Sequence, residues 1–167
     1  MKKIYLAGGC FWGLEHYIRQ VSGIICTTVG YANSLINSPS YEEVKRGLTD
    51  AAETVEIEYD DTIINLHEII QLYFKTIDPE SIDKQGEDEG HQYRTGIYYV
   101  DDKDLEIISE EINALKKVHS IINIEVMKLI NFYKAEDYHQ DYLIKNPQGY
   151  CHIPQELIKY AKKYKNK

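Results

Sequence analysis

The stretch Leu6–Val21, LAGGCFWGLEHYIRQV, places one cysteine between two glycines and two aromatic residues near the start of the chain. The preceding run KKIYLAG has the composition of a short strand. Apolar residues then recur at helical spacing, at Leu14, Tyr17, Ile18 and Val21. We therefore expect Cys10 at a strand-to-helix turn. Four roles are open to it there: a lipid-attachment point, a buried thiol, a metal ligand or a nucleophile.

Outside this stretch, short β-rich runs alternate with helical patterns, which predicts a sheet covered by helices. The expected strands are residues 2–8, 24–32, 54–60, 95–101 and 124–130. The expected helices are residues 11–20, 65–77, 105–118 and 135–145, and a further one from residue 40. Two capping boxes support helix starts, Ser40 with Glu43 and Asn65 with Glu68. The longest turn-like stretch, residues 78–94, lies where binding loops tend to occur.

Bulk composition excludes several classes of protein. The chain has 167 residues, 43% hydrophobic and 28% charged, which predicts one globular domain over residues 1–167. A net charge of −8 argues against a general nucleic-acid binder. The basic tail at residues 158–167 is then expected to be a solvated or frayed terminus. No segment approaches the roughly 20 apolar residues of a membrane span, so no membrane association is expected.

Cysteine usage favours the cytoplasm. An odd set of three scattered cysteines is not the framework of a disulfide-stapled secreted domain. The opening MKKIYLAGGC imitates a lipoprotein signal, but only Ile4–Ala7 separate the lysines from the glycines. A secretory apolar region needs roughly 7–15 residues, so lipid attachment at Cys10 is rejected.

The turn at Cys10 favours a reactive thiol. Free N–H groups and the positive end of a helix dipole stabilise a thiolate, so we expect a lowered pKa at Cys10. Phe11 and Trp12 would supply an apolar wall beside it. A buried, inert Cys10 remains the alternative, because free cysteine is among the most buried residue types. Cys151-His152 has no second metal-ligand pair at suitable spacing, so no metal site is expected.

The segment GGCFWGLE resembles the signature of the type A peptide methionine sulfoxide reductases. Three more segments resemble the family's later blocks in the same order: residues 29–60, 77–99 and 132–151. The resemblance implies an α+β domain with a ferredoxin-like mixed sheet and no cofactor. It also implies reduction of the S epimer of methionine sulfoxide, free or within proteins, with thioredoxin as the reductant.

The resemblance assigns the first chemical step to four residues. Cys10 is implied to attack the sulfoxide sulfur and become a sulfenic acid. Glu53 is implied to be the acid, and the hydroxyls of Tyr41 and Tyr93 to hold the sulfoxide oxygen. Taken without the family, Glu53 reads as a surface carboxylate ahead of a strand, and the tyrosines are two of 15.

Substrate binding and recycling are implied in the same way. Phe11 and Trp12 match the pocket for the methyl on sulfur, and Asp88 matches a further site carboxylate that otherwise reads as part of a solvated acidic loop. Cys151, in the C-terminal segment at residues 146–167, matches the resolving cysteine that forms a disulfide with the oxidised nucleophile. Cys26, inside an apolar strand, is expected in the core.

The chain also departs from the family pattern. Asn33-Ser34 stands where the family usually has two glycines, and Asn tolerates the left-handed conformation. Asp50-Ala51 replaces a small residue and a histidine before the acid. A second recycling cysteine near the C-terminus is absent, so we expect a single Cys10–Cys151 relay in a monomer.

Remaining titratable side chains are given structural roles. Glu136 and His139 are expected to form a structural hydrogen bond at helical spacing, and His91 is expected at the surface. Two rival functions are considered. A thiol peroxidase would consume peroxide faster than sulfoxide, and a binding module for oxidised or methionine-containing segments would release no methionine. The implied acid and paired tyrosines favour the reductase, because neither rival needs an acid at a sulfoxide oxygen.

Overall fold

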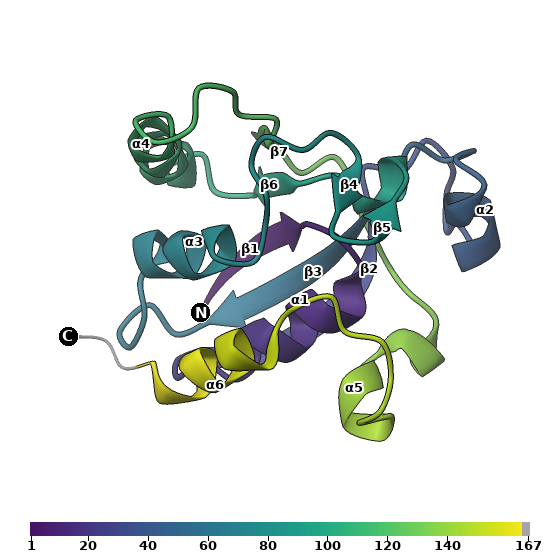
Figure 1. Cartoon of the computed structure of the whole chain (residues 1–167). Helices are drawn as coiled ribbons and strands as arrows, with labels where there is room; N and C mark the ends of the chain where they lie inside the picture. Colours follow the sequence, from purple (N-terminus) through teal and green to yellow (C-terminus); the bar gives the residue numbers. More distant parts are fainter. Residues whose placement is uncertain (165–167) are drawn as a thin grey trace.

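The computed structural model describes residues 1–164 (Figure 1). A six-stranded sheet has the order β7-β6-β1-β3-β2-β8. Its strands are β1 (Lys2–Ala7), β2 (Ile24–Ala32), β3 (Ala52–Tyr59), β6 (Gly96–Tyr99), β7 (Glu125–Lys128) and β8 (Phe132–Lys134), and a separate hairpin joins β4 (Lys84–Gln85) to β5 (Asp88–Glu89). The helices are α1 (Phe11–Ile18), α2 (Tyr41–Lys45), α3 (Leu66–Phe74), α4 (Asp104–Leu115), α5 (Tyr142–Lys145) and α6 (Gln155–Lys163), with 3₁₀ turns η1 (His91–Tyr93) and η2 (Asp137–His139).

The central four strands define the topology. The order β6-β1-β3-β2, with α1 between β1 and β2 and α3 between β3 and β6, is the split βαβ arrangement of ferredoxin-like folds. Neighbours within this group are antiparallel, whereas β7 joins β6 in parallel and makes the sheet mixed. The expected α+β class with a mixed sheet is therefore confirmed.

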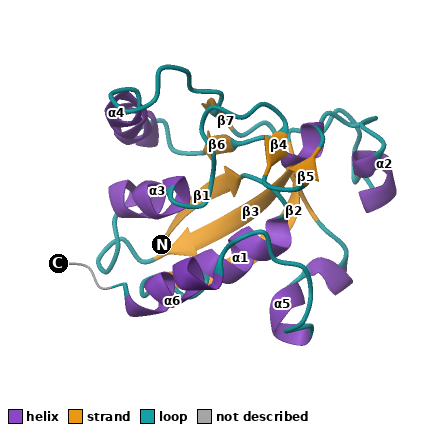
Figure 2. Ribbon diagram, in the orientation of Figure 1, coloured by secondary structure: helices purple, strands orange, loops and turns teal. Residues whose placement is uncertain are grey.

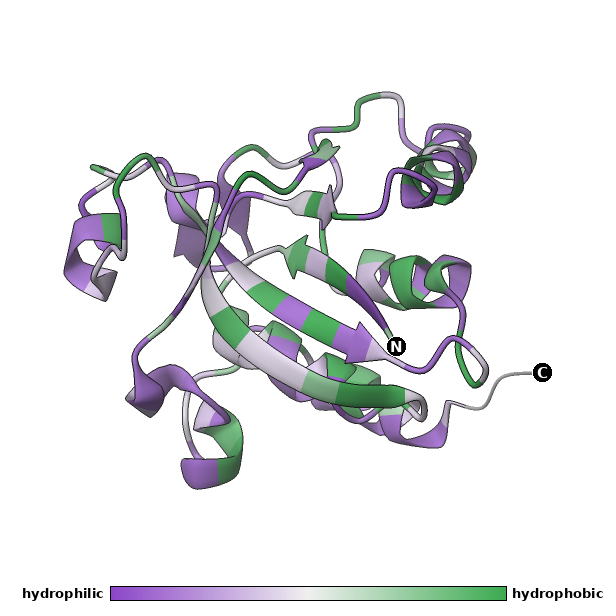
Figure 3. Cartoon of the chain, turned by 180° about the vertical axis from the view of Figure 1, so that it is seen from behind, coloured by the Kyte–Doolittle hydropathy of each residue, from purple (hydrophilic) through white to green (hydrophobic). Residues whose placement is uncertain are grey.

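The two faces of the sheet differ. Helices α1, α3 and α6 lie over one face (Figures 1 and 2), where the main core forms between them and the strands. The view from behind shows β2 and β3 without a covering helix (Figure 3). On that side a smaller cluster forms around Tyr5, Ala32 and Tyr98, and Leu129 and Phe132 pack against it.

Most expected elements are present with shifted ends. Both capping boxes form, because Ser40 and Asn65 accept the backbone N–H of the residue three positions later while the paired glutamate bonds back. Asn33, which stands where the family usually has a glycine, has φ 59°, the left-handed conformation that asparagine tolerates. No helix within residues 1–164 has both the length and the apolar character needed to cross a membrane.

The expected helix over residues 135–145 is wrong. It is divided into η2 and α5 by Asp141, which has a left-handed φ of 53°. The cause is Gln140, whose side chain accepts the N–H of Val29 and donates to its carbonyl, as a neighbouring strand would. A helix over this stretch would turn Gln140 away from that bond.

Two other expectations are corrected. The basic tail is helical up to Lys163 and not frayed there, because α6 buries Ile158 and Ala161 against the core. Its lysines up to Lys163 are exposed, so the expected solvated face is present, and residues 165–167 of the predicted tail lie outside the described part. Cys26 is exposed rather than in the core. A bulge between Ile24 and Cys26 shifts the register of β2 against β3 at this position.

Candidate active site

The turn between β1 and α1 is held by bonds to distant segments. Cys10 occupies the N-cap position of α1 with extended backbone angles, as the sequence predicts. Gly9 has φ 77°, a conformation that favours glycine, and its N–H donates to the Tyr93 carbonyl at 3.1 Å. The Cys10 N–H donates to Asp88 Oδ2 at 3.1 Å, and the Phe11 N–H donates to Glu53 Oε1 at 3.3 Å. Two orphan donors of the helix start are thus satisfied by two carboxyl groups.

Glu53 is a buried acid. It lies near the start of β3 and is only 1% exposed, so the surface alternative is wrong. Its Oε2 accepts a hydrogen bond of 2.6 Å from Gln92 Nε2. Burial raises the pKa of Glu53 to about 8, even though the bonds from Gln92 and from the Phe11 N–H favour the charged form. At neutral pH the carboxyl group therefore carries a proton that it can donate.

The sulfur of Cys10 is a thiol at rest, which corrects the lowered pKa expected from its place at a helix start. Burial raises the pKa of Cys10 first, and the nearby Glu53 carboxyl raises it further. The backbone N–H of Trp12 lowers this pKa, as a helix start should, but the effect is outweighed. Cys10 therefore becomes nucleophilic only when its proton is taken up within the site.

The two tyrosines selected by their motifs meet at the site. Tyr41 begins α2 and Tyr93 ends η1, and their hydroxyls are near enough to affect each other's pKa. Burial raises the pKa of Tyr41 to about 12 and also raises that of Tyr93, with Glu53 adding to both shifts. Both hydroxyls therefore keep their protons near neutral pH and are available as donors.

An aromatic cluster surrounds the start of α1. Phe11 is buried, and Trp12 is stacked on Tyr142 with ring centroids 3.6 Å apart and planes at 7°. The Trp12 indole N–H donates to His139 Nδ1 at 3.0 Å, and the His139 ring also contacts Phe11 at 5.1 Å. These contacts fix the indole plane beside the start of α1, where the sequence predicts an apolar wall.

The expected side-chain bond between Glu136 and His139 is wrong. Within the described residues, His139 bonds to Trp12 instead, and its Nε2 has no partner. Glu136 accepts the Tyr31 hydroxyl at 2.8 Å and the Tyr41 N–H at 2.9 Å. Because η2 is not part of a long helix, these two residues serve different neighbours.

The second thiol lies beside the same helix start. All three cysteines are free, and the Cys151 thiol donates to the Ile153 carbonyl at 3.4 Å. A Cβ placed on Gly13 would lie 3.4 Å from Cys151 Sγ, so the sulfur rests against the first turn of α1. The structure brings together every residue that the resemblance implied: Cys10, Glu53, Tyr41, Tyr93, Asp88, Phe11, Trp12 and Cys151.

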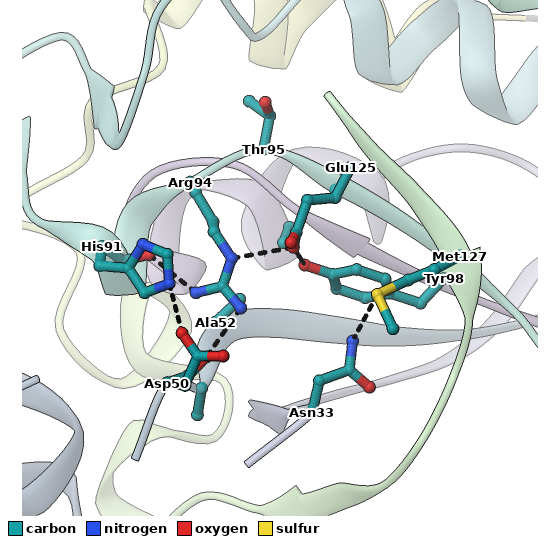
Figure 4. Close-up of polar contacts among 12 residues, drawn as sticks. Asn33, Asp50, Ala52, His91, Arg94, Thr95, Tyr98, Glu125 and Met127 are labelled. Atoms are coloured by element: carbon teal, nitrogen blue, oxygen red, sulfur yellow. Dashed lines mark hydrogen bonds and ion pairs between the residues drawn. The ribbon is translucent and has the colours of Figure 1, made fainter. Parts of the chain in front are cut away.

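Arg94 ties together the segments that carry the acid and its neighbours (Figure 4). Its guanidinium donates to Glu125 Oε1 at 2.8 Å, to the His91 carbonyl at 3.0 Å and to the Asp50 carbonyl at 2.7 Å. His91, at the surface as expected, also bonds to the Asp50 carboxylate. Asp50, where the chain departs from the family pattern, therefore supplies a carboxylate whose bond to His91 holds the segment that leads into Glu53.

Three functional neighbours were missed from the sequence: Gln92, Arg94 and Tyr142. Gln92 and Arg94 flank Tyr93 directly, so their position beside a motif residue is a signal that could have found them. Tyr142 carries no such signal, because its stacking on Trp12 depends on the break between η2 and α5.

The chemistry open to this arrangement is that of a thiol-dependent oxidoreductase. Cys10 can be oxidised by a substrate and then form a disulfide with Cys151, while Glu53 holds a proton beside the reacting sulfur. Residues 2–167 match the model of the family described as peptide methionine sulfoxide reductase. The chain belongs to that family.

Individual relatives agree over most of their length. The peptide methionine sulfoxide reductase MsrA of Lachnoclostridium phytofermentans is 54% identical over 162 residues, covering 96% of this chain and 98% of the relative. Mxr1 of Saccharomyces cerevisiae in its reduced form has a TM-score of 0.85 and 40% identity, covering 90% of this chain and 88% of Mxr1. Mxr1 in complex with Trx2 has a TM-score of 0.61 and 28% identity, covering 84% of each chain.

Replacing Arg94 with alanine should destabilise the fold by about 2–3 kcal/mol, because a buried charged donor and three hydrogen bonds are lost. Urea denaturation measures the change. Lys128→Ala, which removes an ion pair between exposed side chains, should cost below about 1 kcal/mol. Equal losses in the two variants would contradict the role assigned to Arg94.

The raised pKa of Glu53 predicts a pH-dependent stability. An unfolded glutamate has a pKa near 4.3, so between about pH 4 and 8 only the folded chain holds this proton. The contribution is complete below that window and is lost as the pH rises through it, by up to about 1.4 kcal/mol per unit. Urea denaturation between about pH 5.5 and 7.5 should therefore give a flatter dependence for Glu53→Gln than for the parent chain. The exposed substitution Glu42→Gln is the control, and an unchanged slope in Glu53→Gln would refute the assignment.

Proposed function

We propose that this chain reduces the S epimer of methionine sulfoxide, free or within oxidised proteins, to methionine in the cytoplasm. Thioredoxin then reduces the oxidised enzyme back to its dithiol form. The observation that carries the proposal is the buried Glu53, which keeps its proton at neutral pH and bonds to the backbone of the helix that begins at Cys10. A thiol peroxidase or a binding module has no need for a protonated carboxyl group at this place.

In the first step, Cys10 attacks the sulfoxide sulfur and the oxygen passes to the cysteine. The Cys10 sulfur is oxidised by two electrons to a sulfenic acid, and the methionine sulfur is reduced by two electrons. Glu53 donates its proton to the sulfoxide oxygen, which becomes the sulfenic hydroxyl, and the Cys10 thiol proton replaces it on the Glu53 carboxylate, so no external proton is consumed. Because the Cys10 thiol is neutral at rest, this transfer keeps the buried site free of an added charge.

Glu53 is the acid of this step. A sulfoxide oxygen leaves the methionine sulfur readily only when it is protonated, and a positioned acid contributes typically about 10²–10⁴-fold in rate. Tyr41 and Tyr93 donate hydrogen bonds to the same oxygen while charge develops on it. Both hydroxyls lie near Cys10 and Glu53, since each of these groups contributes to the raised pKa of both tyrosines.

Phe11 and Trp12 receive the methyl group on sulfur, and Asp88 provides a polar contact. Contacts of sulfur and methyl groups with aromatic faces are worth about 0.3–1.5 kcal/mol each, enough to favour one orientation of a small substrate group. The stacking of Trp12 on Tyr142 and its bond to His139 support a fixed wall. A fixed wall on one side and donors on the other would distinguish the two epimers.

Recycling proceeds through the C-terminal segment, residues 146–167 of a single domain over residues 1–167. The Cys151 sulfur attacks the Cys10 sulfenic acid, an S–S bond forms, and the hydroxyl leaves as water with the Cys151 proton. A dithiol of thioredoxin then reduces the disulfide and becomes a disulfide itself. The position of Cys151 against Gly13 supports a short movement for this step.

An epimer-resolved assay tests the proposed reaction. With dithiothreitol or thioredoxin, the protein should convert the S-sulfoxide to methionine and leave the R-sulfoxide unchanged. Cys10→Ser should lose at least about 10³-fold in rate, because the nucleophile is gone. Cys26→Ser is a matched control, since this exposed cysteine is remote from the chemistry. Equal turnover of both epimers, or full activity in Cys10→Ser, would refute the proposal.

The relay makes a separate prediction. Cys151→Ser should release one methionine per molecule in a single turnover at the rate of the parent chain, because the first step needs only Cys10. Multiple turnovers with thioredoxin should then be lost, because no intramolecular disulfide can form. Counting the methionine released with and without thioredoxin separates the two steps. Sustained thioredoxin-dependent turnover in Cys151→Ser would exclude the relay.

A further inference from the structure

The residues on both sides of Cys151 converge on Asp88. His152 Nδ1 lies 3.6 Å from Asp88 Oδ2, and the pKa of Tyr150 is raised by burial and by the nearby Asp88 carboxylate. The same Asp88 oxygen accepts the Cys10 N–H at 3.1 Å. One carboxylate therefore connects the turn of Cys10 to the segment of Cys151.

His152 is enclosed by the helix start. Its side chain is only 5% exposed. A Cβ on Gly9 would lie 2.7 Å from Nε2 of this ring, and a Cβ on Gly13 would lie 2.9 Å from Nδ1. The same point on Gly13 is 3.4 Å from Cys151 Sγ, so the imidazole and the thiol rest on one small surface of α1.

The ring of His152 lacks hydrogen-bond partners in this state. Both of its nitrogens are buried without a partner, and burial lowers its pKa although Asp88 and the backbone of Gly8 act in the opposite direction. A buried polar ring without partners is unfavourable, and an apolar side chain would fill the same space without that cost. Its presence is explained by a partner gained in another state of the cycle, and the Asp88 carboxylate is the acidic group already beside it.

We propose that His152 is the positioning residue of the recycling step, whose contact with Asp88 holds the Tyr150–His152 segment in place while Cys151 reaches the oxidised Cys10. The inference rests on the Cys10–Cys151 relay proposed above. A small approach of the segment turns the 3.6 Å separation into a hydrogen bond between Nδ1–H and the carboxylate. The bond that forms fixes the direction from which the Cys151 sulfur attacks.

The role differs from a purely structural one in the step that it affects. The proposed bond of His152 acts on the approach of Cys151, which takes no part in the first step, so methionine release does not depend on it. Disulfide formation depends on it, because a displacement of about 1 Å at a reacting centre can cost about 100-fold in rate. Loss of the contact should therefore lengthen the lifetime of the Cys10 sulfenic acid before Cys151 reacts with it.

The test compares His152→Leu with His152→Gln in the full chain. Leucine fills the space without a hydrogen bond, whereas the glutamine amide can donate to Asp88. Reduced protein is mixed with the S-sulfoxide and followed over a single turnover. Methionine release reports the first step, and the sulfenic acid is trapped with a 1,3-diketone. Loss of thiols, measured by alkylation, reports disulfide formation. In His152→Leu, methionine release should stay within about threefold of the parent chain while disulfide formation slows at least about tenfold. His152→Gln should restore disulfide formation to within about threefold.

His16→Ala is the matched control. This histidine also has a buried ring nitrogen without a partner, and it lines a cavity of about 170 Å³ together with Cys151. It has no bond or ion pair to Asp88 among the described residues, so both steps should keep the rates of the parent chain.

Four results would overturn the inference. They are an unchanged disulfide rate in His152→Leu, equal slowing of both steps, equal slowing in His152→Leu and His152→Gln, and the same slowing in His16→Ala. Failure of the relay itself is distinguishable, because it would appear as sustained thioredoxin-dependent turnover in Cys151→Ser. That outcome removes the step that His152 is proposed to position.

Discussion

The site depends on how the first turn of α1 satisfies its backbone donors. The N–H groups of Cys10 and Phe11 bond to the carboxyl groups of Asp88 and Glu53, which come from distant parts of the chain. A helix start needs such partners, and water or a local cap would serve the helix equally well. Here the partners are two acidic side chains, so β3, which carries Glu53, and the β4–β5 hairpin, which carries Asp88, are joined to the turn at Cys10. The same two bonds that complete the helix therefore assemble the chemical groups around Cys10.

That arrangement reverses the usual electrostatics of a cysteine at a helix start. The N–H of Trp12 favours the thiolate, but burial and the neighbouring carboxyl groups favour the thiol more strongly. Low dielectric also keeps the proton on Glu53, so a neutral acid and a neutral thiol lie together. Neutral groups can be buried at far lower cost than ions, which is why the site can be enclosed by aromatic rings and by the C-terminal segment. The reaction then redistributes protons inside the site instead of starting from a charged nucleophile.

Local sequence patterns predicted those parts of the fold that depend on local physics. The strand-to-helix turn at Cys10 and the capping box at Asn65 follow from hydrogen bonding within a few residues, and both are present. The break at Asp141 depends on Gln140 bonding to Val29 more than 100 residues away, which no window of sequence reveals. The pKa of Cys10 was predicted with the wrong sign for the same reason. The helix effect is local, whereas the burial and carboxylates that outweigh it are tertiary.

The positions of the site residues were predictable only through the family motifs. Glu53 and Asp88 look like surface carboxylates by composition, and Tyr41 and Tyr93 are indistinguishable from other tyrosines. Residues that act through one of these groups were missed, because a motif marks a position but not its partners. Arg94 holds the backbone at Asp50, ahead of the acid, and at His91, and its third bond reaches the Glu125 side chain on a separate segment. Such a residue contributes no atom to the reaction, yet the distance between Glu53 and its neighbours depends on it. A site of this kind is therefore specified as much by its buried polar scaffold as by the cysteine from which its chemistry starts.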